Sequence, residues 1–259
     1  MNRLADKVVA ITGATKGIGR GIALQLARQG ALVAAGGRSE NEGRSLVEEI
    51  ERDIGRPALF VPGDVADEAY CKRLIDETVE RFGRIDGLVN NAGIFPDIPF
   101  CESDGALFDR VYRVNIRGAF LASQRAAAHM ERQGGGSIVM IGSTHAFGAS
   151  PLYSAYGTSK GAMYSLMQYL AKNLASKRIR ANWITVGWVK TEGEIARVLA
   201  DGHDEAWLED IAGRMCPLGG LQDVEDTAYA VIYLLSDESR FVTETDIKVT
   251  AGFVPGHDQ

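Results

Sequence analysis

The sequence predicts an α/β protein built on a single doubly wound parallel sheet of seven strands, with helices on both faces. Two observations carry this prediction. Short apolar runs alternate with longer helical patterns along the chain, which indicates parallel strands joined by helical crossovers. The runs are apolar at successive positions, as in Val8, Val9 and Ala10, which is typical of strands covered on both faces.

The predicted elements alternate in order along the chain. The helix after the first strand has Ile22 and Leu26 among its apolar positions, whereas the helix after the second strand is mostly charged. The predicted strands are residues 7–12, 31–35, 58–61, 87–89, 137–141, 179–184 and 246–249. The predicted helices are residues 17–29, 42–53, 68–82, 107–132, 156–176 and 224–235.

The alternation favours one domain over residues 1–259, because no proline-rich or low-complexity linker interrupts it. It breaks at residues 190–220, a stretch of mixed charge that contains Trp207 and ends in Cys-Pro-Leu-Gly-Gly. We expect an irregular insertion there. Irregular segments of this length in a compact domain often act as functional lids, so we expect a lid on the substrate side.

Composition narrows the classes of function. A net charge of −6 disfavours nucleic-acid binding, which needs a clustered basic face, and favours a small-molecule partner. Cys71, Cys101 and Cys216 lie far apart, and no Cys/His cluster indicates a metal site. No apolar run is long enough for a membrane span or a signal peptide, so we expect a cytoplasmic protein without membrane contact.

A phosphate-binding turn is predicted directly after the first strand, where residues 12–19 read TGATKGIG. The glycines permit a tight turn, close approach of the backbone to a pyrophosphate, and close packing of helix on strand. The helix that begins near Gly17 directs free N–H groups and the positive end of its dipole at the phosphates. The predicted contacts in this turn come from Gly13, Thr15, Lys16, Gly17, Ile18 and Gly19.

Tyr156 and Lys160 form a candidate catalytic pair. They lie four residues apart on a predicted helix, so their side chains share one face. The pKa of a free tyrosine is about 10, and a nearby ammonium lowers it because it favours the phenolate. A tyrosine so tuned can give a proton to a carbonyl oxygen or take one from an alcohol. The alternative is a surface pair without a catalytic role.

Together the motifs resemble those of the short-chain dehydrogenase/reductase family: TGxxxGxG at residues 12–19, NNAG at residues 90–93 and YxxxK at residues 156–160. The likeness extends from about Val8 to Gly252. It implies a Rossmann-like fold and hydride transfer between a nicotinamide dinucleotide and a carbonyl or alcohol.

The resemblance also implies roles for individual residues. Tyr156 is the acid/base, Lys160 tunes it and holds the nicotinamide ribose, and Ser143 orients the substrate carbonyl. Asn115 corresponds to an asparagine that holds a water in a proton relay to the lysine. The remaining cofactor contacts that the resemblance implies are Asp64 and Val65 at the adenine, Asn91, Ala92 and Gly93 after the fourth strand, and Gly187, Val189 and Thr191 beside the nicotinamide.

The sequence favours NADP(H) over NAD(H) as the cofactor. An NAD-selective site commonly has an acidic residue at the end of the second strand, but residues 34–39 read AAGGRS. Arg38 and Lys16 suit a 2′-phosphate, and Ser39 could add a hydroxyl contact. The alternative is that both cations are solvated surface charges, and NAD(H) then stays open.

Aromatic and polar side chains near the catalytic residues suggest a compact substrate pocket. Besides Ser143, its candidates are His145, Tyr153 and Trp188, with Glu194 nearby. Such a pocket suits a sugar, a polyol or another small hydroxylated compound.

Two other functions remain open at this stage. One is a 3-oxoacyl-[acyl-carrier-protein] reductase, for which Arg110, Arg113 and Arg117 would be the basic patch. The other is a non-catalytic dinucleotide-sensing or scaffold protein, which the complete catalytic set disfavours.

Apolar faces on the helices over residues 107–132 and 156–176 exceed the need of one sheet face, so we expect a homotetramer, with a dimer as the alternative. The chain departs from the family's pattern at Val186, where proline is usual. It also departs at Glu244 and Ala251, where glycine is usual.

Overall fold

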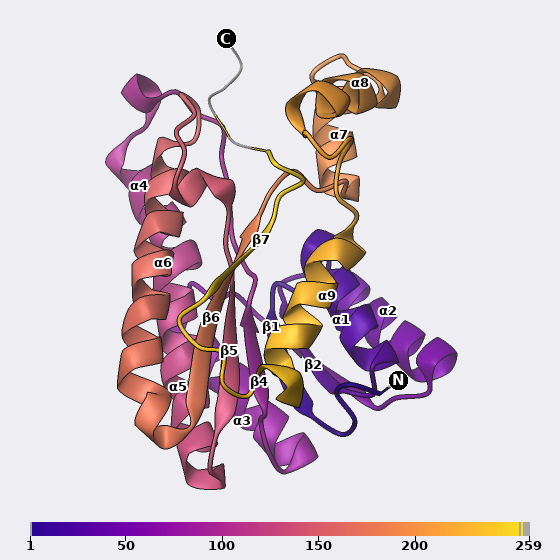
Figure 1. The fold of residues 1–259 in the computed structure, drawn as a ribbon, viewed down its shortest axis with the longest axis vertical. Helices are drawn as coiled ribbons and strands as arrows, with labels where there is room; N and C mark the ends of the chain where they lie inside the picture. Colours follow the sequence, from indigo (N-terminus) through magenta and orange to yellow (C-terminus); the bar gives the residue numbers. More distant parts are fainter. Residues whose placement is uncertain (1, 254, 256–259) are drawn as a thin grey trace.

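The computed structural model describes residues 2–253 and 255. A seven-stranded sheet runs through the molecule in the order β3-β2-β1-β4-β5-β6-β7, and every neighbouring pair is parallel (Figure 1). The predicted fold class is confirmed. The strands are β1 (Val8–Thr12), β2 (Leu32–Gly37), β3 (Ala58–Pro62), β4 (Gly87–Asn90), β5 (Gly136–Ile141), β6 (Ile179–Val186) and β7 (Asp246–Val249).

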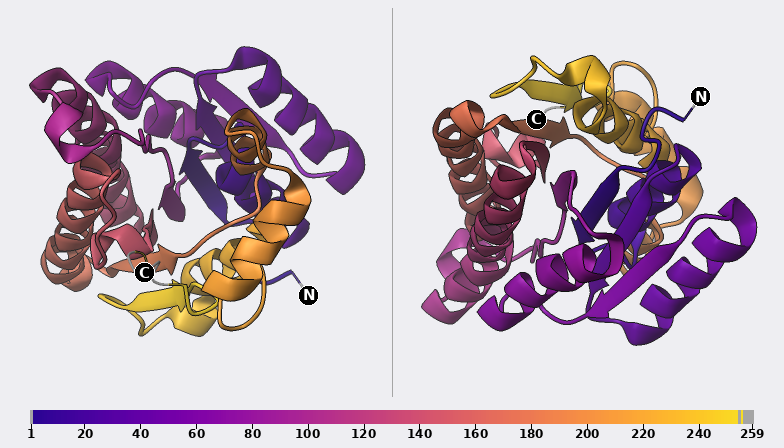
Figure 2. Two further views of the ribbon diagram at one scale, coloured as in Figure 1. Left: turned by 90° about the horizontal axis from the view of Figure 1, so that it is seen from above. Right: turned by 90° about the horizontal axis from the view of Figure 1, so that it is seen from below.

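Two groups of helices cover the two faces of the sheet, as Figure 1 and the end views of Figure 2 show. Helices α1, α2 and α9 pack on one face, and α3, α5 and α6 pack on the other. The main helices are α1 (Gly17–Arg28), α2 (Glu40–Glu49), α3 (Glu68–Phe82), α4 (Gly105–Tyr112), α5 (Gly118–Gln133), α6 (Ser154–Leu174), α7 (Glu192–Ala200), α8 (Glu205–Met215) and α9 (Val224–Leu235). In the described part of the chain, no helix has both the length and the apolarity of a bilayer span.

The strand order places a ligand site at one edge of the sheet. From β1 the chain moves outward through β2 and β3, and it then returns to the other side of β1 as β4. Doubly wound sheets bind ligands at the carboxyl ends of their strands, where the direction of winding reverses. The carboxyl ends of β1, β4 and β5 therefore frame the expected site.

The expectation of an irregular insertion over residues 190–220 is wrong. Most of this segment is helical, in α7 and α8, which lie beyond the carboxyl edge of the sheet (Figure 1). Thr191 caps α7 by accepting a hydrogen bond from the backbone N–H of Glu194 at 3.1 Å, and Asp204 caps α8 in the same way. These N-cap residues were the local signals of two short helices.

The prediction of a single helix over residues 107–132 is wrong, because this range is divided between α4 and α5. A π-helical turn, Arg113–Arg117, lies between α4 and α5, and it contains the buried Asn115. Such turns often occur at functional sites because they redirect side chains within a helix. A second π-helical turn, Ile50–Ile54, extends α2.

The two positions where this chain lacks the family's usual glycine keep the left-handed backbone. Glu244 has φ 60° and Ala251 has φ 50°, a region that costs a non-glycine residue about 1–2 kcal/mol. At Glu244 the conformation is supported by its N–H, which donates to the carbonyl of Ala181 at 2.8 Å, and by an ion pair with Lys172. Both residues therefore strain the backbone locally.

Close packing after β5 gives a test of the fold. A Cβ on Gly142 would lie 2.0 Å from the ring of the fully buried Trp183. We predict that Gly142→Ala lowers the free energy of unfolding by about 1–3 kcal/mol, as overpacking does. Gly213→Ala is the control, because a Cβ there, in the last turn of α8, meets nothing within 4 Å. Urea denaturation measures both variants, and equal stability of the two would contradict the predicted packing.

Candidate active site

The turn between β1 and α1 has the shape of a phosphate cradle. Gly13 and Gly17 have φ values of 65° and 51°, and a Cβ on Gly13 would lie 2.8 Å from the Cα of Ala92. A Cβ on Gly19 would lie 2.2 Å from the carbonyl oxygen of Gly13. The first turn of α1 contains no acidic residue, and its N-cap, Lys16, forms no side-chain cap. The structure therefore leaves the positive end of α1 suited to an anion.

The segment after β4 is tied to this turn. The hydroxyl of Thr12 accepts hydrogen bonds from the N–H groups of Asn91 and Ala92 at 3.0 and 3.1 Å. The Asn91 amide donates to the carbonyls of Thr12 and Gly13. Asn91 and Ala92 thus fix the shape of the cradle. Asn90 instead donates to the buried Ser123, so its side chain is structural.

Asn115 joins three elements of the site. Its Oδ1 accepts from the N–H of Ile94 at 2.8 Å, and its Nδ2 donates to the Ile94 carbonyl and to Ser159 Oγ, each at 2.9 Å. Ser159 in turn donates to the carbonyl of Tyr156. Both amide hydrogens are therefore used in positioning the segment after β4 against α6. The water relay implied by the resemblance stays a prediction.

Lys160 is buried and anchored to the sheet. Its Nζ donates to the carbonyl of Ile141, the last residue of β5, at 2.7 Å. Burial lowers the pKa of Lys160 to about 8, because the charged form loses hydration. A Cβ on Gly93 would lie 3.8 Å from this Nζ and 3.5 Å from Asn115 Oδ1, so Gly93 lies beside both.

Ser143 follows the carboxyl end of β5, and Tyr156 lies in the first turn of α6. The two side chains meet between these elements. Burial raises the pKa of Tyr156 to about 12, and a hydrogen bond with Ser143 partly offsets this rise. The pKa of Tyr156 is thus raised overall, where the sequence predicted that Lys160 would lower it. Lys160 Nζ lies 5.7 Å from the centroid of the Tyr156 ring and donates to Ile141 instead. The loss of hydration therefore outweighs the attraction of the ammonium.

Aromatic rings surround Tyr156. The ring centroids of His145, Tyr153 and Phe95 lie 5.8, 6.4 and 5.9 Å from that of Tyr156. Burial lowers the pKa of His145, so its ring is neutral at neutral pH. The structure thus brings the predicted residues Ser143, His145 and Tyr153 together around the hydroxyl-bearing Tyr156.

Trp188 belongs to a polar group on α7 instead of this aromatic cluster. Its Nε1 donates to Glu194 Oε1 at 2.7 Å, and Arg197 donates to both oxygens of Glu194 at 2.6 and 3.2 Å. Arg197 and Glu194 both influence the pKa of Tyr153, which places this group close to the cluster. Arg197 was not among the predicted site residues, because this segment was expected to be irregular. The i,i+3 spacing of Glu194 and Arg197 is, however, a signal of a helix.

The adenine side carries paired charges. Lys16 Nζ lies 2.6 Å from Glu42 Oε1, and Arg38 lies 3.8 Å from Asp64. Ser39 is the N-cap residue of α2 without a side-chain cap. The remaining predicted contacts pack behind the cradle: Thr15 is nearly buried against Gly37, Ile18 packs on the core, and Val65 is buried beside Gly118.

The segment after β6 completes the site. Val189 pairs with Gln222 in a short parallel bridge, and Gly187 lies against the side-chain amide of Gln222. A Cβ on Gly17 would lie 3.6 Å from Thr191 Cγ2, so Thr191 reaches the phosphate cradle. Gly187, Val189 and Thr191 thus follow β6 at the same edge of the sheet as Ser143, which follows β5.

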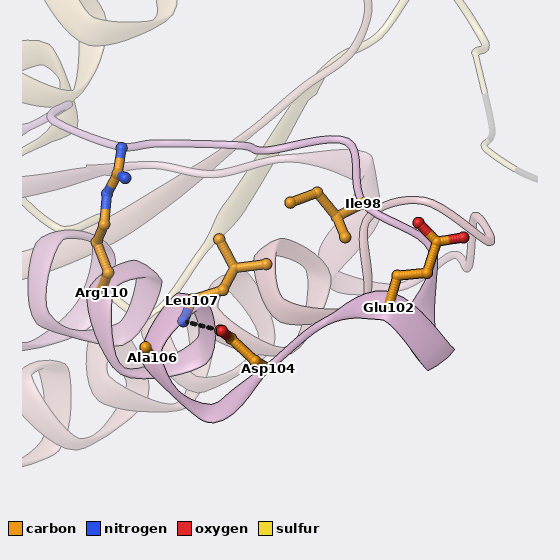
Figure 3. A pocket seen from close by; sticks show the side chains of 6 residues that line it. All are labelled: Ile98, Glu102, Asp104, Ala106, Leu107 and Arg110. Atoms are coloured by element: carbon orange, nitrogen blue, oxygen red, sulfur yellow. Dashed lines mark hydrogen bonds between the residues drawn. The ribbon is translucent and has the colours of Figure 1, made fainter.

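A separate hollow of about 340 Å³ lies where the chain enters α4 (Figure 3). Its only lining residue named among the predictions is Arg110, which belongs to the basic patch of the alternative function. Asp104 there caps α4 through the N–H of Leu107. The hollow is lined by Ile98, Glu102, Asp104, Ala106, Leu107 and Arg110.

Comparison with known proteins gives a consistent result. A family model described as enoyl-(acyl carrier protein) reductase matches residues 13–254. An uncharacterised oxidoreductase of Thermotoga maritima is 39% identical and is aligned over 95% of this chain and 96% of its own length. An L-rhamnose 1-dehydrogenase (NAD(P)(+)) of Sphingomonas sp. is 37% identical, over 97% of this chain and 98% of its own.

Among solved structures, a short-chain type dehydrogenase/reductase from Mycobacterium ulcerans superposes with a TM-score of 0.88 at 32% identity. The superposition covers 96% of this chain and 90% of that chain. Sequence and architecture therefore agree over nearly the whole length.

Burial of Lys160 predicts a pH dependence of stability. Its pKa is about 8 in the folded protein and about 10.4 in an unfolded chain, so the unfolded state binds more protons between these values. As the pH falls from about 10 to 8, the unfolded chain takes up the proton first, so the free energy of unfolding decreases.

We predict that the stability difference between the wild type and Lys160→Met changes by about 2–3 kcal/mol in favour of the wild type from pH 7 to pH 10. Urea denaturation at each pH measures it, with Lys172→Met on the exposed face of α6 as the control. A difference that is independent of pH would show that Lys160 titrates normally.

Proposed function

Because the chain belongs to the short-chain dehydrogenase/reductase family and is an oxidoreductase acting on CH–OH groups, we propose that it interconverts the carbonyl and alcohol of a small hydroxylated compound with NADP(H). The observation that carries this proposal is the convergence of Ser143, Tyr156 and Lys160 at the carboxyl end of β5. A sugar or a polyol is the substrate class that we favour.

The residues around the cradle fit a dinucleotide. The absence of a Cβ at Gly13 and Gly19 allows the close packing of this turn, and the first turn of α1 has free N–H groups beside it. Arg38 and Lys16 would hold a 2′-phosphate. Bound at this edge, the nicotinamide would supply or accept the hydride.

The chain's own residues handle the proton. With a pKa of about 12, Tyr156 is protonated at neutral pH and is ready to donate to a carbonyl oxygen. Ser143 orients the same oxygen by a hydrogen bond. The Lys160 ammonium nearby would stabilise the phenolate that this donation leaves. In the oxidative direction Tyr156 takes the proton from the alcohol.

The polar side chains around Tyr156 support a hydroxylated substrate. Tyr153 and the neutral His145 offer hydrogen bonds near Tyr156, and Glu194 with Arg197 adds a charged group at the α7 side. Hydroxyl groups can bind both carboxylate and guanidinium. The sugar dehydrogenase among the relatives supports the same substrate class.

A 3-oxoacyl-[acyl-carrier-protein] reductase is the second candidate, because a relative of that name from Thermotoga maritima is 35% identical over 97% of this chain and 99% of its own length. Its basic patch would comprise Arg110, Arg113 and Arg117. Arg117, however, pairs with Glu68 at 3.0 Å and donates to the carbonyl of Ala66. This internal pairing leaves fewer free cations for an acidic carrier.

We further propose a homotetramer, with a dimer as the alternative. A mainly apolar groove of about 560 Å³ lies along α4, the π-helical turn of residues 113–117, α5 and α6. Its apolar lining is Tyr112, Ile116, Phe120 and Leu166, and its charged lining is Asp109, Arg113 and Arg117. Phe120 is 47% exposed in the single chain. A second copy covering this face would remove that apolar surface from water.

The proton-donor role gives the main functional prediction. Tyr156→Phe should lower kcat by roughly 10²- to 10⁴-fold because the proton donor is lost, while the Kd of NADPH changes less than about threefold. L-Rhamnose and a panel of sugars, polyols and ketones are screened by nicotinamide absorbance. Tyr169→Phe on the exposed face of α6 is the control. Undiminished activity of Tyr156→Phe would overturn the assignment.

The groove gives a prediction about assembly. Phe120→Glu places a charge on the apolar face, so light scattering should give a smaller assembly than the wild-type tetramer. Leu218→Glu, at a position 84% exposed after α8, should leave the mass unchanged. A wild type of one-chain mass would contradict the proposed tetramer.

A further inference from the structure

Glu42 supplies a carboxylate that the end of β2 lacks. It lies in the first turn of α2, and its Oε1 is 2.6 Å from Lys16 Nζ. Its Oε2 is buried and accepts no hydrogen bond from the described residues. The side chain as a whole is 37% exposed, and its contact with Lys16 holds the carboxylate at this point.

The position of this pair follows from the sheet. Strands β1 and β2 are adjacent and parallel, and Lys16 follows β1 as Arg38 follows β2. In doubly wound folds the adenosine ribose lies at these two strand ends, where an acid binds its 2′-hydroxyl or a cation binds its 2′-phosphate. Glu42 therefore lies beside the group that distinguishes NAD(H) from NADP(H).

The charges at this point cancel. Lys16 is paired with Glu42, and Arg38 lies 3.8 Å from Asp64. If only Lys16 and Arg38 are considered, the site should strongly prefer a 2′-phosphate. With both carboxylates included, the attraction for a doubly charged phosphate is much weaker.

We propose that Glu42 is a specificity-determining residue that restrains binding of the 2′-phosphate and thereby keeps NAD(H) usable. The inference rests on the proposed function, because it concerns the same nucleotide site. Lys16 is 68% exposed, and exposed ion pairs are weak, so Lys16 can turn to a phosphate. The Glu42 carboxylate would remain nearby and repel it.

Removal of the carboxylate should change the nucleotide preference. In Glu42→Gln, Lys16 is released and the repulsion is lost, while the side chain keeps its size. The Kd of NADPH should fall roughly tenfold, and the Kd of NADH should change less than about threefold. The difference in NADPH affinity between the wild type and Glu42→Gln should shrink in high salt, because Lys16 and Glu42 are accessible to solvent ions.

Glu40→Gln is the matched control. Glu40 lies in the same turn of α2, but its carboxylate pairs with Arg44 at 3.2 Å instead of Lys16. The same net charge is lost, so a general field effect would appear in both variants. A local effect appears only in Glu42→Gln.

The experiment measures the Kd of NADPH, NADH and 2′,5′-ADP by calorimetry for the wild type and both variants. Glu42→Ala is a second variant if Glu42→Gln folds poorly, as judged by circular dichroism. A roughly tenfold gain in the NADPH/NADH preference that is confined to position 42 supports the proposal. An unchanged preference, or an equal gain in Glu40→Gln, overturns it and leaves the proposed function intact. Failure of the wild type to bind either dinucleotide overturns the proposed function as well.

Discussion

The hydrogen bond from Lys160 to the carbonyl of Ile141 fixes the geometry on which the rest of the site depends. It pins α6 to the carboxyl end of β5. Ser143 follows Ile141 by two residues, and Tyr156 precedes Lys160 by one helical turn, so the two hydroxyls are brought together from separate elements. Because the amine is buried, this bond also replaces hydration that Lys160 has lost. One polar contact thus positions the proposed catalytic group.

Similar polar contacts hold the other segments at this edge of the sheet. Asn115 binds the backbone after β4 and reaches α6 through Ser159. Thr12 and Asn91 bind the cradle and the same segment to each other. Each loop is therefore positioned by a side chain from another element. The backbone that would approach a dinucleotide is preorganised by interactions that involve no ligand.

Local spacing made much of this predictable. The alternation of strands and helices, and the shared helix face of Tyr156 and Lys160, follow from periodicity and from a four-residue separation on a helix. The pKa of Tyr156 could not be predicted, because burial is a tertiary property that outweighs the neighbouring charge. The partner of Lys16 was missed for the same reason, since Glu42 reaches it from another element. The helices α7 and α8, in contrast, could be predicted from the sequence, because Thr191 and Asp204 are typical N-cap residues.

The most direct measurement of the central claim follows the hydride itself. The protein is incubated with NADPH or NADH deuterated at C4 of the nicotinamide, together with a panel of ketoses and small ketones, and the alcohols are analysed by mass spectrometry. With deuterium at both C4 positions, hydride transfer predicts one deuterium on the carbinol carbon of the product. Absence of any labelled alcohol across the panel with both cofactors would contradict the account.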